Sequence, residues 1–250
     1  MKLISVIIPY YKKKDFIKKT LLSVINQSYK NFEILLVYDD ETKEDLSYIK
    51  NISKMDTRIK LIVNKKNLGA GMSRNKAIKF SKGEFLAFID ADDIWKKKKL
   101  EKQINFMIKK KAAISHTSYV IINNKNKILK VRKAKKISTH QNLLEDCDIG
   151  CSTVILKKKI ISKKIKFPNL KTKEDFVLWL NLSKKYTIYG LDKKLTMWRN
   201  LDNSLSKNVS QKIFDGYKVY RNYMGFGIFK SIKYLYLLSF NFLKKNYLYT

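Results

Sequence analysis

The chain has 250 residues and 45% of them are hydrophobic, which is enough for a buried core in one large domain or two small ones. Its 54 Lys and Arg against 21 Asp and Glu give a formal charge of +33, which favours a polyanionic partner such as nucleic acid, an anionic membrane or a phosphate-bearing substrate. This composition excludes a disordered chain. The apolar runs at 3–8 and 234–243 are too short for a spanning helix, which needs roughly 20 residues, and no signal peptide is expected.

Short apolar strands and helical patterns alternate along the first 110 residues. The expected strands cover residues 3–8, 33–38, 58–64 and 84–90, and a further strand follows at 113–121. The helical patterns between them lie at 15–27, around Leu46 and Ile49, after the turn at 67–71, and from Leu100 to Ile108. Such alternation predicts an α/β fold in which helices cover both faces of a parallel sheet.

The alternation weakens after residue 120. The pattern predicts a hairpin turn at 123–126, a strand at 149–156 and an amphipathic helix at 173–185, which we expect to form a second wall of a cleft. Residues 216–250 interleave aromatic side chains with lysines. This composition suits either an interfacial helix on an anionic membrane or a helix docked on the domain.

The cysteines and histidines show no metal-binding pattern. Cys147 and Cys151 stand four apart without a second pair, and His116 and His140 form no spaced cluster. We therefore expect free thiols in a reducing compartment and histidines that are structural or at the surface.

Polar residues follow each of the first four predicted strands. They are Pro9-Tyr10-Tyr11, Asp39-Asp40, Asn67-Leu68-Gly69 with Arg74, and Asp90-Ala91-Asp92-Asp93. Ligands of open α/β sheets bind at the carboxyl ends of the strands. We therefore expect these residues to form one site.

The stretch FLAFIDADDIW crowds three carboxylates, Asp90, Asp92 and Asp93, into four positions. Like charges this close repel unless a cation lies between them, and Mg²⁺ or Mn²⁺ with oxygen ligands keeps open positions for substrate phosphates. We therefore expect a metal-bound nucleoside diphosphate here, with a tyrosine facing the base and Asp39 accepting hydrogen bonds from it.

Simpler roles fit the same local patterns. Asp90 and Asp93 suit the amino-terminal cap of the helix expected after Trp95, and Asp175 suits a first helical turn. Gly69-Ala70-Gly71 lacks the third glycine of a dinucleotide-binding fingerprint, so turn and cap roles suffice for it.

Five segments, taken in order, resemble the family 2 glycosyltransferases of the GT-A fold. They are VIIPYYKKKDFIKKTLLSVINQSYKNFEILLVYDDET, NLGAGMSRNKAI, FLAFIDADDIW, KEDFVLWLNL and LTMWRNLDNSLS. The resemblance implies that Pro9, Tyr10, Tyr11 and Asp39 bind the nucleotide, Arg74 lies near the base or phosphates, Asp90 and Ala91 lie near the ribose, Asp92 or its neighbour Asp93 holds the metal, and Asp175 is the catalytic base.

The resemblance also implies an activity: inverting transfer of a sugar from a nucleotide-sugar donor, usually a UDP-sugar, to a glycan or glycolipid hydroxyl, with Mn²⁺ or Mg²⁺ as cofactor. Residues 1–215 would form the GT-A domain, with the donor on 1–110 and the acceptor on 111–215, and 216–250 would form a helical tail. The family commonly works in bacterial surface polysaccharide or lipooligosaccharide synthesis. We therefore expect a lipid-linked acceptor and a cytoplasmic protein that is peripheral on the inner face of the membrane.

The chain departs from the family pattern in two places. The usual V-D-D-G-S-T is replaced by residues 37–42, VYDDET, so Tyr38 stands in place of the first acid and base selectivity is open. The histidine that usually follows Y-R is missing, because Asn200 and Leu201 come after Trp198-Arg199.

Two other functions compete with this interpretation. A phosphatase that forms an aspartyl phosphate also has D-x-D after a strand, and turnover of phosphate esters without a sugar donor would favour that class. A nucleic-acid-binding protein would explain the charge, but the sequence has no recognised binding module, and the acidic strand ends would repel phosphate without a metal. We therefore expect no nucleic acid partner.

Overall fold

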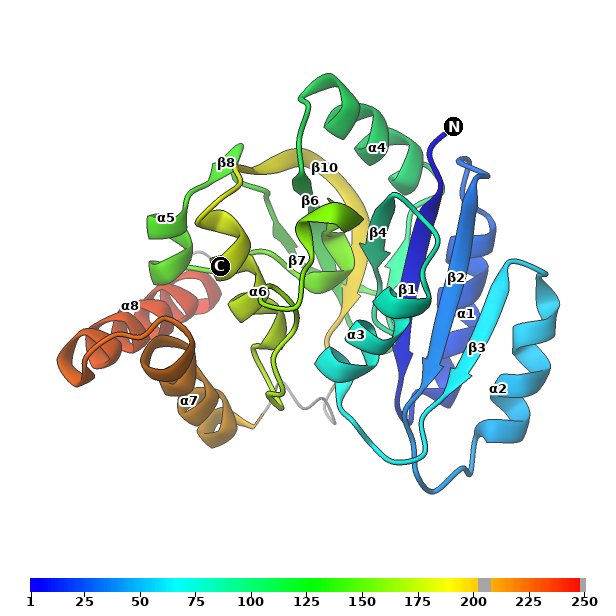
Figure 1. Ribbon diagram of the computed structural model, residues 1–250, viewed down its shortest axis with the longest axis horizontal. Coiled ribbons are helices and arrows are strands. Elements are labelled where there is room, and N and C mark those ends of the chain that lie inside the picture. The colour runs from blue at the N-terminus through cyan, green and yellow to red at the C-terminus, as the bar shows by residue number, and fades with distance from the viewer. Residues whose placement is uncertain (202–207, 248–250) are drawn as a thin grey trace.

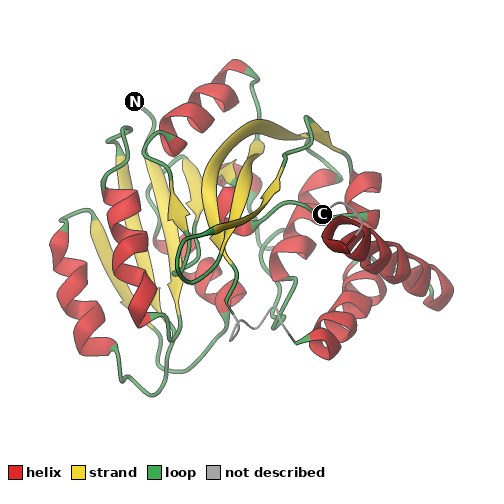
Figure 2. Ribbon diagram, turned by 180° about the vertical axis from the view of Figure 1, so that it is seen from behind, coloured by secondary structure: helices red, strands yellow, loops and turns green. Residues whose placement is uncertain are grey.

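One mixed sheet runs through the protein, and helices cover both of its faces (Figures 1 and 2). The computed structural model describes residues 1–201 and 208–247, and side chains as far as residue 245. The strands are β1 (Ile4–Tyr10), β2 (Phe32–Tyr38), β3 (Ile59–Val63), β4 (Phe85–Phe88), β5 (Ile94–Trp95), β6 (Ile114–Ile122), β7 (Ile128–Arg132), β8 (Ile137–Ser138), β9 (Ile155–Lys157) and β10 (Ile188–Arg199). They follow the order β3-β2-β1-β4-β9-β6-β10-β5, with β7 beside β6 and β8 beside β10.

The directions of the strands bring several carboxyl ends together. Strands β1 to β4 are linked by parallel pairs, and β10 is parallel to β6. Because β9 runs antiparallel to both β4 and β6, the strands β6 and β10 share the direction of the first four. We call the shared edge, where Tyr10, Tyr38, Ile122 and Arg199 end their strands, the carboxyl edge.

The helices form a layer on each face. They are α1 (Lys14–Ile25), α2 (Leu46–Ile52), α3 (Ala70–Phe80), α4 (Lys99–Lys109), α5 (His140–Glu145), α6 (Glu174–Ser183), α7 (Val209–Lys218) and α8 (Ile228–Tyr247). Alternate residues of β1 serve the two faces, since Val6 and Ile8 belong to the core with α1, α2 and α4, whereas Ile7 belongs to the core with α3, α5 and α6. The α/β fold with its mostly parallel sheet is confirmed.

Most predicted elements are present. The five strands expected before residue 122 correspond to β1, β2, β3, β4 and β6, the helices expected at 15–27 and 173–185 correspond to α1 and α6, and the turn at 123–126 joins the antiparallel pair β6 and β7. Cys147 and Cys151 are free thiols. His116 is buried, and His140 Nδ1 lies 2.9 Å from Ser183 Oγ. In the described ranges, every helix is too short or too polar to cross a membrane.

The strand predicted at 149–156 is wrong over most of its length, because only Ile155–Lys157 is extended in the sheet and a 3-10 turn occupies Cys151–Thr153. Thr153 bonds Gly150 O through both its backbone N and its Oγ1, which closes the turn. Strand β10 was not expected from the pattern, because the run Asp192-Lys193-Lys194 interrupts its apolar alternation where the register with β6 shifts.

The C-terminal segment folds back on the rest of the chain. A π-helical turn at Val219–Tyr223 follows α7 directly and leads towards α8. The rings of Tyr220 in this turn and Tyr234 in α8 stack with their centroids 5.7 Å apart. Tyr220 also meets Phe176 of α6 edge to face, with 6.3 Å between centroids. One side of α8 therefore packs on the rest of the domain. This agrees with the second of the two alternatives predicted for this segment, a helix docked on the domain. Residues 202–206, which end the LTMWRNLDNSLS segment, lie outside the described residues.

Strand β10 depends on a glycine. Gly190 N donates to Lys136 O at 3.0 Å, and a Cβ atom at position 190 would lie 2.0 Å from Lys135 O. We expect Gly190→Ala to lower the free energy of unfolding by about 2–3 kcal/mol, because backbone must shift to make room. Urea unfolding followed by circular dichroism measures this change.

The matched control is Gly227→Ala, since nothing lies within 4 Å of a Cβ atom there. We expect its unfolding midpoint to stay within error of the parent. An unchanged midpoint in Gly190→Ala as well would contradict the close approach at β10.

Candidate active site

Arg74 is a cation that lies directly against Asp90, the first carboxylate of FLAFIDADDIW. It projects from α3, is 3% exposed, and donates from Nη2 to Asp90 Oδ1 at 2.6 Å and from Nη1 to Glu174 Oε1 at 2.7 Å. Both hydrogen bonds are charge-assisted on both sides, which makes them strong. The guanidinium therefore ties the residues after β4 to the first turn of α6.

A glycine allows α3 and α6 to approach closely. A Cβ atom at Gly71 would lie 2.9 Å from Glu174 Cγ and 2.9 Å from Pro168 O. Gly69 has a φ of 80°, a conformation that favours glycine, and it caps the start of α3. The expected turn-and-cap role thus holds for Gly69, whereas Gly71 has a packing role that the pattern did not reveal.

Asp92 and Asp93 lie in different surroundings. Asp92 Oδ2 lies 3.2 Å from Lys13 Nζ, and its side chain is partly exposed. Asp93 is fully buried, and its Oδ1 accepts a hydrogen bond from the backbone N of Arg199 at 2.8 Å. Arg199 also donates from Nε to Asp92 O at 2.8 Å. The end of β10 is thereby fixed against the loop that follows β4.

Burial is the main reason why the negative charges of Asp92 and Asp93 are disfavoured. Burial raises the pKa of Asp92, and the charge of Asp90 adds to the rise while Lys13 opposes it. Burial together with the charges of Asp92 and Asp90 raises the pKa of Asp93 well above its usual range. A further cation would relieve this repulsion, and carboxylate oxygens are the donors that Mn²⁺ and Mg²⁺ prefer. The residues present therefore fit a divalent ion that completes its shell with phosphate and water oxygens. Over 1–201 and 208–247, no three or more His, Cys, Asp and Glu side chains group as a metal cluster.

A second polar cluster lies beside the first at the carboxyl edge. Asp39 Oδ1 accepts hydrogen bonds from Asn64 Nδ2 at 2.7 Å and from Leu68 N at 2.8 Å. Asn64 Nδ2 also donates to Ser73 Oγ at 2.9 Å. Because Ser73 directly precedes Arg74 on α3, this one helix connects the cluster at the end of β2 with the carboxylates after β4.

The tyrosines at the ends of β1 and β2 differ in exposure. Tyr10 and Tyr38 are buried and stacked, with 5.5 Å between centroids and 17° between planes, and Tyr10 Oη donates to Asp45 Oδ2 at 2.6 Å. Tyr11 is 40% exposed. Of these rings, Tyr11 is therefore the one open to a ligand, while Tyr38, which replaces an acid of the family pattern, is part of the core.

Asp175 lies in the first turn of α6, next to the Arg74 ion pair. The helix begins after Lys173, whose φ of 63° is left-handed, and Phe176 N donates to Asp175 Oδ1 at 2.7 Å. Burial raises the pKa of Asp175 to about 7, with the charge of Glu174 adding to the rise and that of Arg74 opposing it. A carboxylate with this pKa can accept a proton efficiently at neutral pH.

The other predicted site residues contribute backbone rather than side chains. Pro9 pairs with Val37 inside the sheet, and Ala91 O accepts a hydrogen bond from Thr20 Oγ1 at 2.9 Å. Two partners were missed by the pattern. Glu174 was visible only as the neighbour of Asp175, and Lys13 was hidden in a run of lysines.

Comparison with known proteins bears on what this arrangement does. The family model for glycosyl transferase family 2 matches residues 5–165. The putative teichuronic acid biosynthesis glycosyltransferase TuaG of Bacillus subtilis is 36% identical over 88% of this chain and 87% of its own length. The UDP-Glc:alpha-D-GlcNAc-diphosphoundecaprenol beta-1,3-glucosyltransferase WfgD of Escherichia coli is 38% identical over 84% of this chain and 82% of its own length.

Solved structures share the fold at lower identity. TarS of S. aureus in complex with UDP-GlcNAc matches with a TM-score of 0.71 and 22% identity, over 98% of this chain and 74% of that one. The mannosyltransferase PcManGT from Pyrobaculum calidifontis, in complex with GDP-Man and Mn²⁺, matches with a TM-score of 0.68 and 13% identity, over 94% and 70%. These likenesses show the GT-A fold that the sequence predicted. Since the family model spans more than half of the chain and the two relatives align along most of it, the protein belongs to glycosyl transferase family 2 and is a glycosyltransferase.

Proposed function

We propose that this protein is an inverting glycosyltransferase that moves a hexosyl or N-acetylhexosaminyl group from a UDP-sugar to a hydroxyl of a lipid-linked glycan, in the synthesis of bacterial surface polysaccharide. The observation that carries the proposal is the position of Asp175, which has a pKa near 7 and lies beside the ion pair that joins α6 to the carboxylates after β4. Support for the donor and acceptor comes from the names of WfgD and of the TarS complex with UDP-GlcNAc.

The donor would lie across the carboxyl edge. Asp39, held by Asn64 and Leu68, would accept hydrogen bonds from the base, and the exposed ring of Tyr11 would cover it. Arg74 and Asp90, which are joined by a hydrogen bond, would lie between the base and the phosphates, and Asp90 would bond the ribose. Pro9 and Ala91 would form the backbone walls of this pocket.

Asp92 is the better candidate for the metal than Asp93. Asp93 is fully buried and already accepts a hydrogen bond from Arg199 N, whereas the side chain of Asp92 is partly exposed. Once bound, Mn²⁺ or Mg²⁺ would offset the negative charge that develops on the departing diphosphate.

Asp175 would act as the general base. Its carboxylate would take the proton of the acceptor hydroxyl as that oxygen bonds to the anomeric carbon, while the bond from that carbon to the diphosphate oxygen breaks. One displacement of this kind inverts the anomeric centre. The ion pair of Glu174 with Arg74 would hold the base in position, because it fixes the first turn of α6.

Variants of Asp92 and Asp175 separate donor binding from chemistry. We expect Asp92→Ala to weaken UDP-sugar binding in the presence of Mn²⁺ by roughly tenfold or more, because a ligand of the ion is lost. We expect Asp175→Asn to bind the donor normally and to lose about a hundredfold or more in transfer rate, because the proton acceptor is lost. Calorimetry with a panel of UDP-sugars measures binding, and sugar transfer or donor hydrolysis measures the rate.

The matched control is Asp56→Asn, since Asp56 pairs with Arg58 just before β3, at the opposite end of the strand from the carboxyl edge. It should leave both readouts unchanged. Undiminished donor binding by Asp92→Ala would remove Asp92 from the metal site, and normal transfer by Asp175→Asn would remove Asp175 as the base.

The pH dependence of the transfer rate tests the role of the Asp175 carboxylate. Because the base works when it is ionised, the rate at saturating donor should rise with pH and reach half its plateau near pH 7, following the pKa of Asp175. In Glu174→Gln the midpoint should move to lower pH, because the negative charge that helps to raise this pKa is gone. A midpoint that stays in place in Glu174→Gln would mean that another group limits the rate.

A further inference from the structure

The C-terminal helix α8 is apolar on two opposite sides. Its inner side carries Ser231, Tyr234 and Leu238, which are buried against the rest of the chain. Its outer side carries an exposed stripe of apolar residues, spaced three or four positions apart so that they share one helical face. These residues, which we call the outer stripe, are Phe229, Ile232, Tyr236, Phe240 and Leu243, each at least 47% exposed and Phe229 90% exposed.

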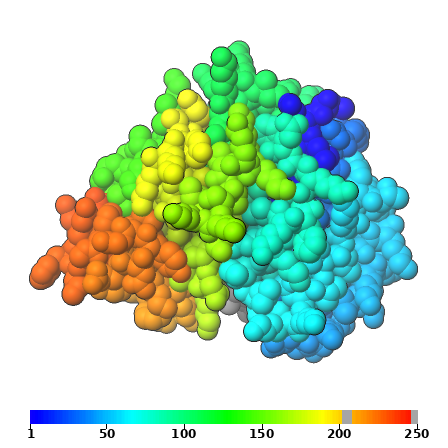
Figure 3. Space-filling model, in the orientation of Figure 1, coloured from blue at the N-terminus to red at the C-terminus, as the bar shows by residue number. Residues whose placement is uncertain are grey.

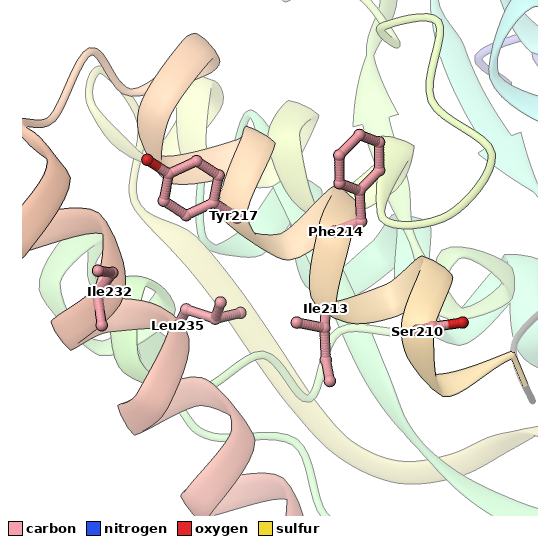
Figure 4. A pocket seen from close by; sticks show the side chains of 6 residues that line it. All are labelled: Ser210, Ile213, Phe214, Tyr217, Ile232 and Leu235. Carbon is pink, nitrogen blue, oxygen red and sulfur yellow. The ribbon is translucent and has the colours of Figure 1, made fainter.

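The apolar surface continues from α8 onto α7. An open groove of about 570 Å³ runs between the two helices, and Figure 4 shows Ile213 of α7 and Leu235 of α8 pointing towards each other across it. Phe214 and Ile232 also line the groove and are exposed by more than half. In Figure 3 these helices, coloured orange, project from one end of the molecule. A solvent-exposed face that carries large apolar rings is typical of an interaction surface.

Positive charge surrounds this apolar surface. Residues 208–247 contain seven Lys and Arg, of which Lys245 pairs with Asp146 and Asp148, but a single acid, Asp215. Asp215 is 1% exposed and turned inward, where its Oδ2 accepts hydrogen bonds from Thr172 N and Thr172 Oγ1, both at 2.9 Å. Lys218 lies over the ring of Phe214 with its Nζ 4.1 Å from the centroid, and Lys233 is exposed beside Ile232. The surface therefore presents apolar rings and cations with no exposed acid among the described residues.

We propose that α7 and the outer stripe of α8 bind the surface of an anionic lipid bilayer. Aromatic and aliphatic side chains would enter the boundary between headgroups and acyl chains, and the lysines would meet lipid phosphates. A second copy of this chain fits less well, because it would bring the same cations against one another. A nucleic acid would satisfy the charge but would leave the outer stripe exposed to water.

This surface is tied directly to the candidate active site. Tyr234 of α8 stacks on Tyr220, and Tyr220 in turn meets Phe176, the residue after Asp175. Asp215 of α7 anchors Thr172 in the loop that leads into α6. Binding of α7 and α8 to a bilayer would therefore orient the acceptor side of the carboxyl edge relative to the membrane. The inference goes beyond the proposed sugar transfer and rests on the geometry of α7 and α8 alone.

Vesicle binding tests the proposal without reference to catalysis. The full chain is sedimented with phosphatidylcholine vesicles that contain or lack phosphatidylglycerol, at low and at high salt. We expect binding that needs the anionic lipid and weakens as salt rises. The double variant Phe229→Ser with Lys233→Gln should bind at least about tenfold more weakly. It loses a ring that would be buried in the lipid and a positive charge that would meet the lipid phosphates.

The matched control is Lys79→Gln with Phe80→Ser at the end of α3, which removes the same two residue types at exposed positions elsewhere. It should bind like the parent. Equal loss in the two double variants, or no binding of the parent to anionic vesicles, would overturn the proposal. So would a dimer, seen by sedimentation velocity without lipid, that the Phe229→Ser change dissociates, because it would assign the surface to a second copy.

Donor hydrolysis by the same variants keeps the two proposals apart. Phe229 and Lys233 lie outside the donor and base residues, so hydrolysis of the UDP-sugar in the absence of lipid should be unchanged. Vesicle binding without any sugar transfer would support the membrane surface and refute the proposed function, and transfer without vesicle binding would do the reverse.

Discussion

The paired hydrogen bonds of Arg74 are the interaction on which the rest of the site depends. A buried guanidinium is stable only if its charge is matched, and here Asp90 and Glu174 match it from elements that are far apart in the sequence. Breaking such a pair by removing one partner typically costs about 3–5 kcal/mol, because the other charge stays buried. The close approach of α3 and α6 at Gly71 is what brings the three groups together, so packing and charge fix the same contact.

Charge acts at two scales in this protein. The overall charge of +33 attracts anionic molecules from a distance. At the carboxyl edge Asp90, Asp92 and Asp93 crowd three carboxylates into four positions, and burial together with their mutual repulsion raises the pKa values of Asp92 and Asp93 although Lys13 lies against Asp92. An anionic donor that arrives alone would be repelled at short range, whereas one that carries a divalent cation would be held. In the proposed reaction the local carboxylates would thus favour the metal-bound form of a donor that the whole surface attracts.

Sequence patterns predicted the groups that follow the strands, because a strand end is a local feature. Arg74, Asp90, Asp92 and Asp175 could be found from spacing and from the ordered resemblance. The partnership of Glu174 with Arg74 could not, since it joins residues 100 positions apart and exists only once α3 packs against α6. The different surroundings of Asp92 and Asp93 could not be predicted for a similar reason. Asp93 is distinguished by a hydrogen bond from the backbone N of Arg199 on β10, which is far away in the sequence.

The first turn of α6 links the site to the C-terminal helices through consecutive residues. Glu174 bonds Arg74, Asp175 is the candidate base, and Phe176 packs on Tyr220 beneath α8. Because α6 and α8 are rigid and are packed together through Tyr220, a bilayer bound by α8 would determine the orientation of Asp175 relative to the membrane. An acceptor confined to a membrane can reach the base only if the carboxyl edge is presented to that membrane. Because the tail is docked on Phe176 through Tyr220, a membrane bound by α7 and α8 would meet the carboxyl edge in one fixed orientation.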